Sequence, residues 1–215
     1  MTVFTRWQDV FAGLPIAVKC LEEIDRTDLR SVAYSEQSDD MNDRSTFARR
    51  CVGAGIKEPV ALRIDWRVRN TGLLDDIRKK AGGRRVFIYQ PRKAVKNDAM
   101  ALLQPERGAF NRFVGGFADH FRVKLGYPPY VEDDAELPCE LDLFGKGNVC
   151  DTLDVCTLGD AFFSEPSFLT CIAEALDKPA VCMFTRRAMN SDTWVRNITP
   201  TRIFHTQRAT AVYDE

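Results

Sequence analysis

A polar turn between an apolar strand and an amphipathic helix carries the residues best suited to hold an anion. It lies in the run GDAFFSEPSFLTCIAEALDKPAVCMF, residues 159–184, where Pro166 suits the first helical position. A helix that begins there leaves the N–H groups of Ser167 and the next two residues without partners, and the helix dipole favours an anion beside them. The turn therefore predicts a phosphate site. Its predicted members are Glu165, Pro166, Ser167, Phe168 and Thr170.

The same run has a second interpretation. Glu165 opposes an anion unless its carboxylate turns to sugar or ribose hydroxyls. An ordinary crossover helix that binds nothing is the alternative, since most such helices in α/β proteins have no ligand. Either way, the helical period predicts a buried stripe made of Phe168, Leu169, Ile172, Ala173 and Leu176.

A basic loop follows the apolar strand RRVFIYQP, residues 84–91. It contains Arg92, Lys93 and Lys96. The carboxyl ends of parallel strands meet at one edge of a sheet, so these cations are expected to reach the same crevice as Ser167 and to neutralise a diphosphate. A solvated basic loop is the alternative interpretation.

Three further positions are candidates for contacts with a nucleobase or ribose: Tyr127, Asp142 and Gly145. The alternatives are a stiff surface segment at Tyr127-Pro128-Pro129 and a tight glycine turn at 145–147. An acidic cluster at 132–136 offers oxygen ligands. A solvated loop explains it better, so no metal and no cofactor is expected.

Composition narrows the class of protein. The 215 residues have a net charge of −1, with 30 basic and 31 acidic side chains, which gives no overall signal for nucleic acid. Seven cysteines include no CxxC pair, and two histidines are too few to suggest a zinc site, so free thiols in a reducing compartment are expected. No run approaches the ~18 apolar residues of a membrane span. These features predict a cytoplasmic protein.

The order of elements predicts an α/β fold. After residue 84 the periodicities read β-α-β-β-α-β-α-β, which is typical of a parallel sheet with helices on both faces. Before it, LLDDIRKKAGG at 73–83 predicts a helix that ends at a double glycine, and VALRIDW at 60–66 alternates as an exposed strand does. The glycine pair at 82–83 is the predicted hinge between two parts.

Two segments carry a resemblance to a known family. FIYQPRK, and LDLFGKGNVCDTLDVCTLGDAFFSEPSFLTCIAEALDKPAVCMF at 141–184, resemble the donor-binding domain of GT-B glycosyltransferases, most closely the heptosyltransferase-like family of lipopolysaccharide cores and its phage-borne relatives. The resemblance implies a reduced, acceptor-side α/β part at residues 1–82. It implies a Rossmann-like domain for the nucleotide-sugar at residues 83–215.

The chain departs from the family's pattern at the last helix. Pro166-Ser167-Phe168 replaces the family's Asp-Ser-Gly, and Cys171 stands at the position of its histidine. The N-terminal part is short, and the family's opening strand and glycine-rich loop have no visible counterpart. The catalytic base is therefore unknown, with Asp9 a weak candidate.

The resemblance implies transfer of a sugar from a nucleoside diphosphate sugar to a hydroxyl of a saccharide or other acceptor. The alternative is a non-catalytic nucleotide or nucleotide-sugar binding module, or an accessory subunit with a degenerate fold. A second copy or a partner subunit that completes the cleft belongs to these expectations.

Overall fold

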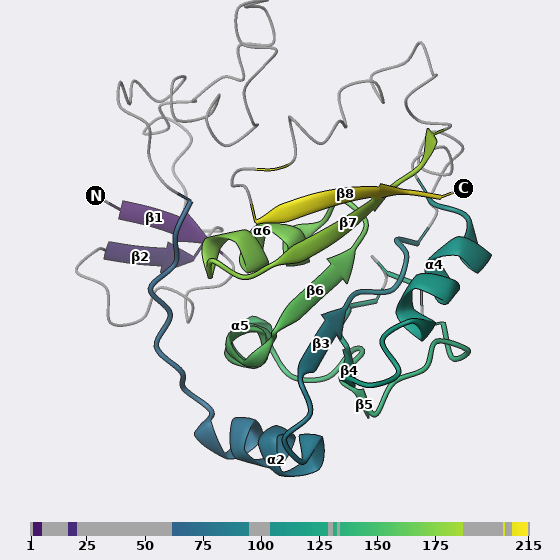
Figure 1. Ribbon diagram of the computed structural model, residues 1–215. Coiled ribbons are helices and arrows are strands. Elements are labelled where there is room, and N and C mark those ends of the chain that lie inside the picture. Colours follow the sequence, from purple (N-terminus) through teal and green to yellow (C-terminus); the bar gives the residue numbers. More distant parts are fainter. Residues whose placement is uncertain are drawn as a thin grey trace, which may run out of the picture.

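A six-stranded, all-parallel sheet forms the centre of the part that the computed structural model describes, which is residues 2–5, 17–20, 62–94, 104–128, 131–132, 134–186, 204 and 208–214. Its strands are β3 (Val86–Tyr89), β4 (Phe121–Lys124), β5 (Leu141–Asp142), β6 (Ala161–Ser164), β7 (Ala180–Phe184) and β8 (Ala209–Tyr213). Their order across the sheet is β5-β4-β3-β6-β7-β8 (Figure 1). Counted from β3, this is the 3-2-1-4-5-6 order of doubly wound nucleotide-binding sheets.

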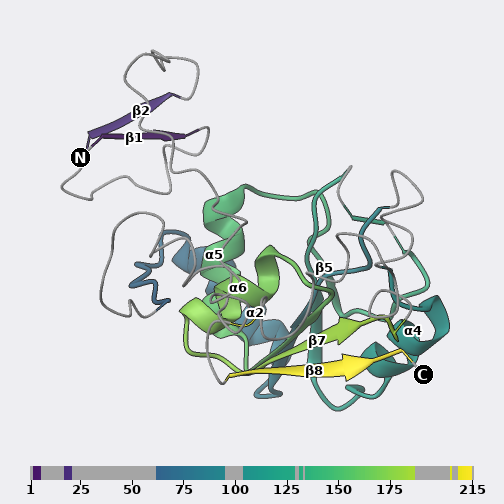
Figure 2. The same cartoon turned by 90° about the horizontal axis from the view of Figure 1, so that it is seen from above.

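Helices cover both faces of this sheet. On one face lie α2 (Thr71–Ala81), α5 (Val149–Leu158) and α6 (Phe168–Ala175), and on the other lies α4 (Arg107–Gly115) (Figure 2). Alternate residues of one strand therefore enter different cores: Ile88 packs with α2, α5 and α6, whereas Phe87 packs with α4. Burial on both faces explains why these strands read as continuous apolar runs.

Helix α2 has clear signals at both ends. The Asn70 side chain accepts a hydrogen bond from the N–H of Leu73, and the helix ends at Gly82, whose φ of 60° is left-handed. The predicted helix and its glycine stop are confirmed. Leu74 and Ile77 belong to the core beneath the sheet, so α2 packs with the sheet although the predicted division places it in the preceding part. The division at 82–83 itself stays a prediction.

The segment before α2 is extended but is not a strand. The alternation is present, with Ile64 and Trp66 partly buried and Asp65 exposed, yet residues 62–68 pair with no strand. Instead the N–H of Ile64 donates to the carbonyl of Ala175, 2.9 Å away. The prediction of a strand at 60–66 is therefore wrong within the described residues, because this segment bonds to helices rather than to a strand: Ile64 to the end of α6, and Trp66 to Asp154 in α5.

The N-terminal part is described only at two short strands. β1 (Thr2–Thr5) pairs in parallel with β2 (Ala17–Cys20). The reduced N-terminal domain otherwise stays a prediction. Among the described helices, none is both long and apolar enough to cross a membrane.

Candidate functional site

The sheet has a topological switch point between its two central strands. The chain leaves β3 for α4 on one face and leaves β6 for α6 on the opposite face. A crevice opens where such neighbouring strands diverge, and ligands of doubly wound folds bind there. The residues that follow β3 are 90–94 and those that follow β6 are 165–167, so the predicted basic loop and the predicted turn flank this point.

Lys93 and Glu165 join the two sides of the switch point. The backbone N–H of Lys93 donates to Glu165 Oε1 at 2.9 Å, and the Lys93 ammonium donates to the carbonyl of Pro166. Three residues named from the sequence are thus brought together. Their role in binding a donor stays a prediction.

Helix α6 begins later than the sequence predicts. Ser167 is its N-cap, with extended backbone angles, and the first helical residue is Phe168 rather than Pro166. Serine is favoured at the N-cap because its Oγ accepts a hydrogen bond from the N–H of Leu169, at 3.2 Å. The cap at this end of the helix is an uncharged hydroxyl.

A short chain of hydroxyl groups lies behind that cap. Ser167 Oγ donates to Ser164 Oγ at 2.9 Å, and Ser164 shares a hydrogen bond of 2.9 Å with Thr170 Oγ1. Thr170 is buried, so the structure places its side chain in the interior rather than at the surface of the crevice. The contact of Thr170 with a donor remains an untested prediction.

Phe168 departs from the predicted buried stripe. Its side chain is 56% exposed, whereas Leu169, Ile172 and Ala173 are buried as predicted. Because Phe168 is the first residue of the helix, it lies at the end of the stripe, where no preceding helical turn covers it. The prediction of burial is therefore wrong at Phe168, whose exposed ring lies beside the switch point, and Leu176 is only partly buried.

The N-terminus of α4 is the other helix end next to the switch point, and a carboxylate already occupies it. Glu106 is the N-cap of α4, and its two carboxylate oxygens accept the N–H groups of Gly108 and Ala109. These two bonds hold the pKa of Glu106 below its usual value. Of the two described helix N-termini beside the switch point, α6 is therefore the one whose cap carries no negative charge.

Arg92 is part of a network that fixes the loop after β3. Its guanidinium lies 2.8 Å from Glu132 Oε2 and donates to the carbonyl of Pro105 at 3.0 Å. Gln104 adds a bond of 2.7 Å to the carbonyl of Lys93. The buried charge of Arg92 is thus balanced by Glu132, whereas the Lys93 ammonium donates its hydrogen bond to the carbonyl of Pro166.

Glu165 is almost fully buried, with 2% of its surface exposed. Burial raises its pKa to about 7, against the opposing effects of Lys93 and Arg92. A carboxyl group that is neutral over part of the physiological range thus stands next to the α6 N-terminus.

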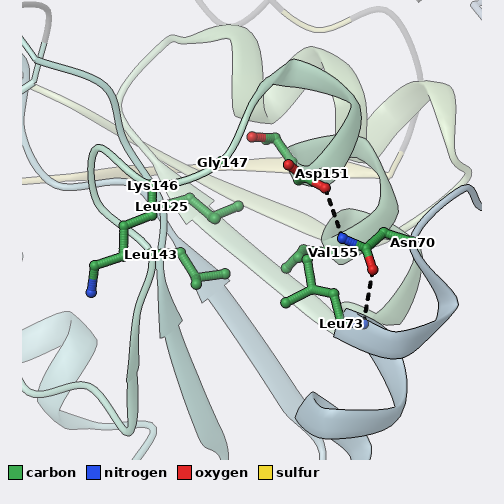
Figure 3. Close-up of a pocket in the computed structure, with 9 residues that line it drawn as sticks. Asn70, Leu73, Leu125, Leu143, Lys146, Gly147, Asp151 and Val155 are labelled. Atoms are coloured by element: carbon green, nitrogen blue, oxygen red, sulfur yellow. Dashed lines mark hydrogen bonds between the residues drawn. The ribbon is translucent and has the colours of Figure 1, made fainter.

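A cavity of about 240 Å³ opens at the carboxyl ends of β4 and β5 (Figure 3). Its apolar wall is formed by Leu73, Leu125, Leu143 and Val155, and the remaining lining residues are Asn70, Lys146, Gly147, Asp151 and Thr152. Asn70 Nδ2 donates to Asp151 Oδ1 at 3.1 Å, which ties the start of α2 to the start of α5. The Lys146 ammonium points away from the cavity and donates to the carbonyl of Asp142.

The three predicted nucleotide contacts surround this cavity without lining it. The Tyr127 hydroxyl donates to the carbonyl of Asn148, Asp142 pairs with Lys124 at 2.7 Å, and Gly145 has a φ of 66°, which requires glycine. Leu125 and Leu143, which do line the cavity, were not predicted from the sequence. An apolar residue at the end of a strand cannot be told from a core residue by its type alone.

Some predicted residues lie outside the described part of the chain. Lys96 and Asp9 are the two that bear on the site. Within the described residues, no group of three His, Cys, Asp or Glu side chains is placed to hold a metal ion.

The structure is similar to two solved glycosyltransferases. One is a glycosyl transferase family 9 protein from Veillonella parvula, with a TM-score of 0.56 and 10% identity over 84% of this chain and 51% of that chain. The other is E. coli ADP-heptose LPS heptosyltransferase II, with a TM-score of 0.51 and 14% identity over 75% of this chain and 50% of that chain. The chain thus spans about half the length of each.

No protein-family model and no curated protein matches the sequence. Identities of 10% and 14% make the likeness one of fold. The predicted Rossmann-like parallel sheet with helices on both faces is confirmed, and the chain adopts a heptosyltransferase-like GT-B fold.

Proposed function

We propose that the chain binds a nucleoside diphosphate sugar at the switch point and acts in glycosyl transfer to an acceptor hydroxyl. The observation that carries this proposal is the meeting of Lys93 with Glu165-Pro166 beside the uncharged N-terminus of α6, in a fold shared with two glycosyltransferases. The order of strands supports it, because ligands of such sheets bind at this point.

The diphosphate is assigned to the N-terminus of α6. The first-turn N–H groups of a helix and its dipole stabilise negative charge, and the competing site at α4 is filled by Glu106. Lys93 adds a cation that can change partners, because its ammonium is bonded to a carbonyl, which is a weaker acceptor than a phosphate. These groups would stabilise the charge that develops on the leaving diphosphate during transfer.

The nucleoside is assigned to the cavity at the ends of β4 and β5. From β6 to β5 the sheet is three strand spacings wide, or about 14 Å. A ligand that lies along the carboxyl edge of the sheet with its phosphates at α6 thus directs its base toward Leu125 and Leu143. An apolar wall with a few polar groups suits a planar base.

The acceptor side is assigned to the N-terminal part, residues 1–82. A saccharide or other hydroxyl needs a general base, which the N-terminal part would supply. Asp9 remains the weak candidate. Because one structural neighbour is named for ADP-heptose, ADP-linked sugars are the first donors to test.

A second candidate function is a nucleotide-sugar binding module without catalysis, or an accessory subunit whose cleft a partner completes. One observation favours it. Pro166-Ser167-Phe168 and Cys171 stand where the resemblance implies Asp-Ser-Gly and a histidine on this helix.

Thermal unfolding in the presence of ADP, UDP, GDP, CDP and dTDP, alone and as sugar conjugates, tests the donor site. A ligand at about 100 times its Kd stabilises the fold by about 2.7 kcal/mol, which raises the Tm of a chain this long by roughly 5–10 °C. Lys93→Ala is expected to weaken binding about tenfold or more, because a hydrogen bond to a charged group contributes about 1.5–3 kcal/mol.

Lys79→Ala is the matched control, since Lys79 is an exposed cation in the last turn of α2, away from the switch point. A Tm that no nucleotide or conjugate raises would overturn the donor site. A conjugate that binds, yet is neither hydrolysed nor transferred with any acceptor, would favour the binding module over the transferase.

A further inference from the structure

Glu165 is a carboxylate in a place where a diphosphate is proposed to bind. It stands two residues before the N-cap Ser167, and its side chain is 2% exposed. One of its oxygens accepts the backbone N–H of Lys93 at 2.9 Å. The Lys93 N–H belongs to the backbone, which does not move with a side chain when a ligand binds. This bond therefore holds the Glu165 carboxylate close to the crevice.

The charges around Glu165 come from three directions. Lys93 and Arg92, in the loop after β3, favour its ionised form, and Glu132 opposes it. Arg92 is itself paired with Glu132 at 2.8 Å, so its positive charge is largely neutralised by that carboxylate. On the neighbouring strand β7, burial raises the pKa of the Cys182 thiol, which stays neutral. Lys93 is therefore the main cation that compensates an ionised Glu165.

A diphosphate at α6 would remove that compensation. The Lys93 ammonium would turn from the Pro166 carbonyl to a phosphate, and the new negative charges would lie near a carboxylate that is shielded from water. Like charges in a buried site cannot both ionise without a large cost, so one of them takes up a proton. The esterified phosphates of a nucleotide-sugar are strong acids, which leaves Glu165 as the group that does so.

We propose that binding of a nucleoside diphosphate sugar is coupled to the uptake of one proton from solvent by the Glu165 carboxylate. This inference rests on the proposed donor site. In the bound state the neutral carboxyl group keeps one oxygen as acceptor for the Lys93 N–H and gains an O–H that can donate to a ligand oxygen.

The sign of the pH effect follows from the free protein. With a pKa of about 7, Glu165 is protonated in acid and binding then requires no proton. Above that pH the free protein must first take up a proton, so affinity falls by about tenfold per pH unit until the pKa of the bound form is reached. Binding is thus expected to be strongest below neutrality and to weaken in mild alkali.

Isothermal titration calorimetry with ADP-ribose tests the coupling in the full chain. This probe has two esterified phosphates, whereas a terminal phosphate titrates near pH 6 and would obscure the result. Titrations at about pH 8 in two buffers of different ionisation enthalpy are expected to show uptake of close to one proton for each ligand bound. At about pH 5.5 the uptake is expected to be near zero.

Glu165→Gln isolates the carboxylate, because an amide oxygen still accepts the Lys93 N–H but carries no charge. This variant is expected to bind about tenfold more tightly than the natural chain at about pH 8, with no proton uptake and a flat pH profile. Glu136→Gln, the same change at an exposed position, is expected to keep the natural profile.

Three outcomes are distinguishable. Proton uptake in the natural chain that disappears in Glu165→Gln supports the coupling. ADP-ribose binding with no uptake at either pH overturns the coupling and leaves the donor site standing; this measurement needs no variant. If neither ADP-ribose nor the conjugates of the other four nucleotides bind at either pH, the donor site fails and the coupling falls with it.

Discussion

At the scale of single residues, Asp154 shows how a buried carboxylate anchors a segment distant in sequence. It has no exposed surface, and it accepts hydrogen bonds from Trp66 Nε1 at 2.6 Å, from the N–H of Asn70 at 2.7 Å and from the N–H of Arg69 at 3.1 Å. These donors come from the extended segment that leads into α2. The sequence alone does not predict the contact of Trp66 with Asp154, because nothing local connects residues that are 88 positions apart.

Asp154→Ala is therefore expected to destabilise the fold by about 3–5 kcal/mol, since it leaves several donors without an acceptor in a site that water does not reach. Urea unfolding measures the loss. Asp160→Ala is the control: Asp160 also accepts a backbone bond, from Val86 at 2.8 Å, but it is exposed and water replaces it, so about 1 kcal/mol is expected. Equal losses in the two variants would contradict the anchoring role.

The candidate site likewise has some contacts that the sequence predicts and others that it does not. The meeting of Lys93 with Glu165 and Pro166 could be predicted, because parallel strands place the residues after them at one edge. Two features could not be predicted: that Glu106 caps the N-terminus of α4, and that Leu73 lines the cavity. The cap at Glu106 and the position of Leu73 in α2 both depend on the residue at which a helix begins. A sequence pattern predicts that residue only to within a few positions.

At the scale of elements, the strands and helices of the sheet were predictable because both of its faces are buried. Continuous apolar runs such as VFIY and AVCMF mark β3 and β7, and both are confirmed. β8 is not among the predicted strands, although ATAVY has the β-branched and aromatic residues of a strand. It is the last strand of the described sheet, and its positions are partly buried or, at Thr210, exposed, so it lacks the continuous apolar signal of its neighbours.

The turn between α5 and β6 depends on a glycine. A Cβ at Gly159 would lie 2.3 Å from Phe162 Cζ and 2.9 Å from Ile88 Cδ1, and both side chains are buried. Gly159→Ala is expected to destabilise the fold by about 1–3 kcal/mol through overpacking, measured by thermal or urea unfolding. Gly115→Ala, at the last residue of α4 with nothing within 4 Å, is expected to stabilise it by about 0.5–1 kcal/mol. If Gly159→Ala left the free energy of unfolding unchanged, the turn would have shifted to accommodate the methyl group, and the overpacking prediction would be wrong.

At the scale of the whole molecule, the strand order places the proposed site beside the most protected part of the fold. β3 and β6 pair with a strand on each side and are covered by helices on both faces, and the side chains of Phe87, Ile88 and Phe163 have no exposed surface. A rigid pair of strands suits a binding crevice, because the residues that follow them are held in place before a ligand arrives.

Hydrogen exchange followed by mass spectrometry tests this distribution of stability. Amides of β3 and β6 are expected to exchange only through global unfolding, at rates roughly a thousandfold below those of β5 and β8, which open locally. The reason is that β5 has two residues, both partly exposed, and β8 has one described strand neighbour, β7. Protection of β8 equal to that of β3 would contradict an open edge. Such protection, if it weakened on dilution, would mean that a second copy of the chain covers β8, and it would bear on the accessory role.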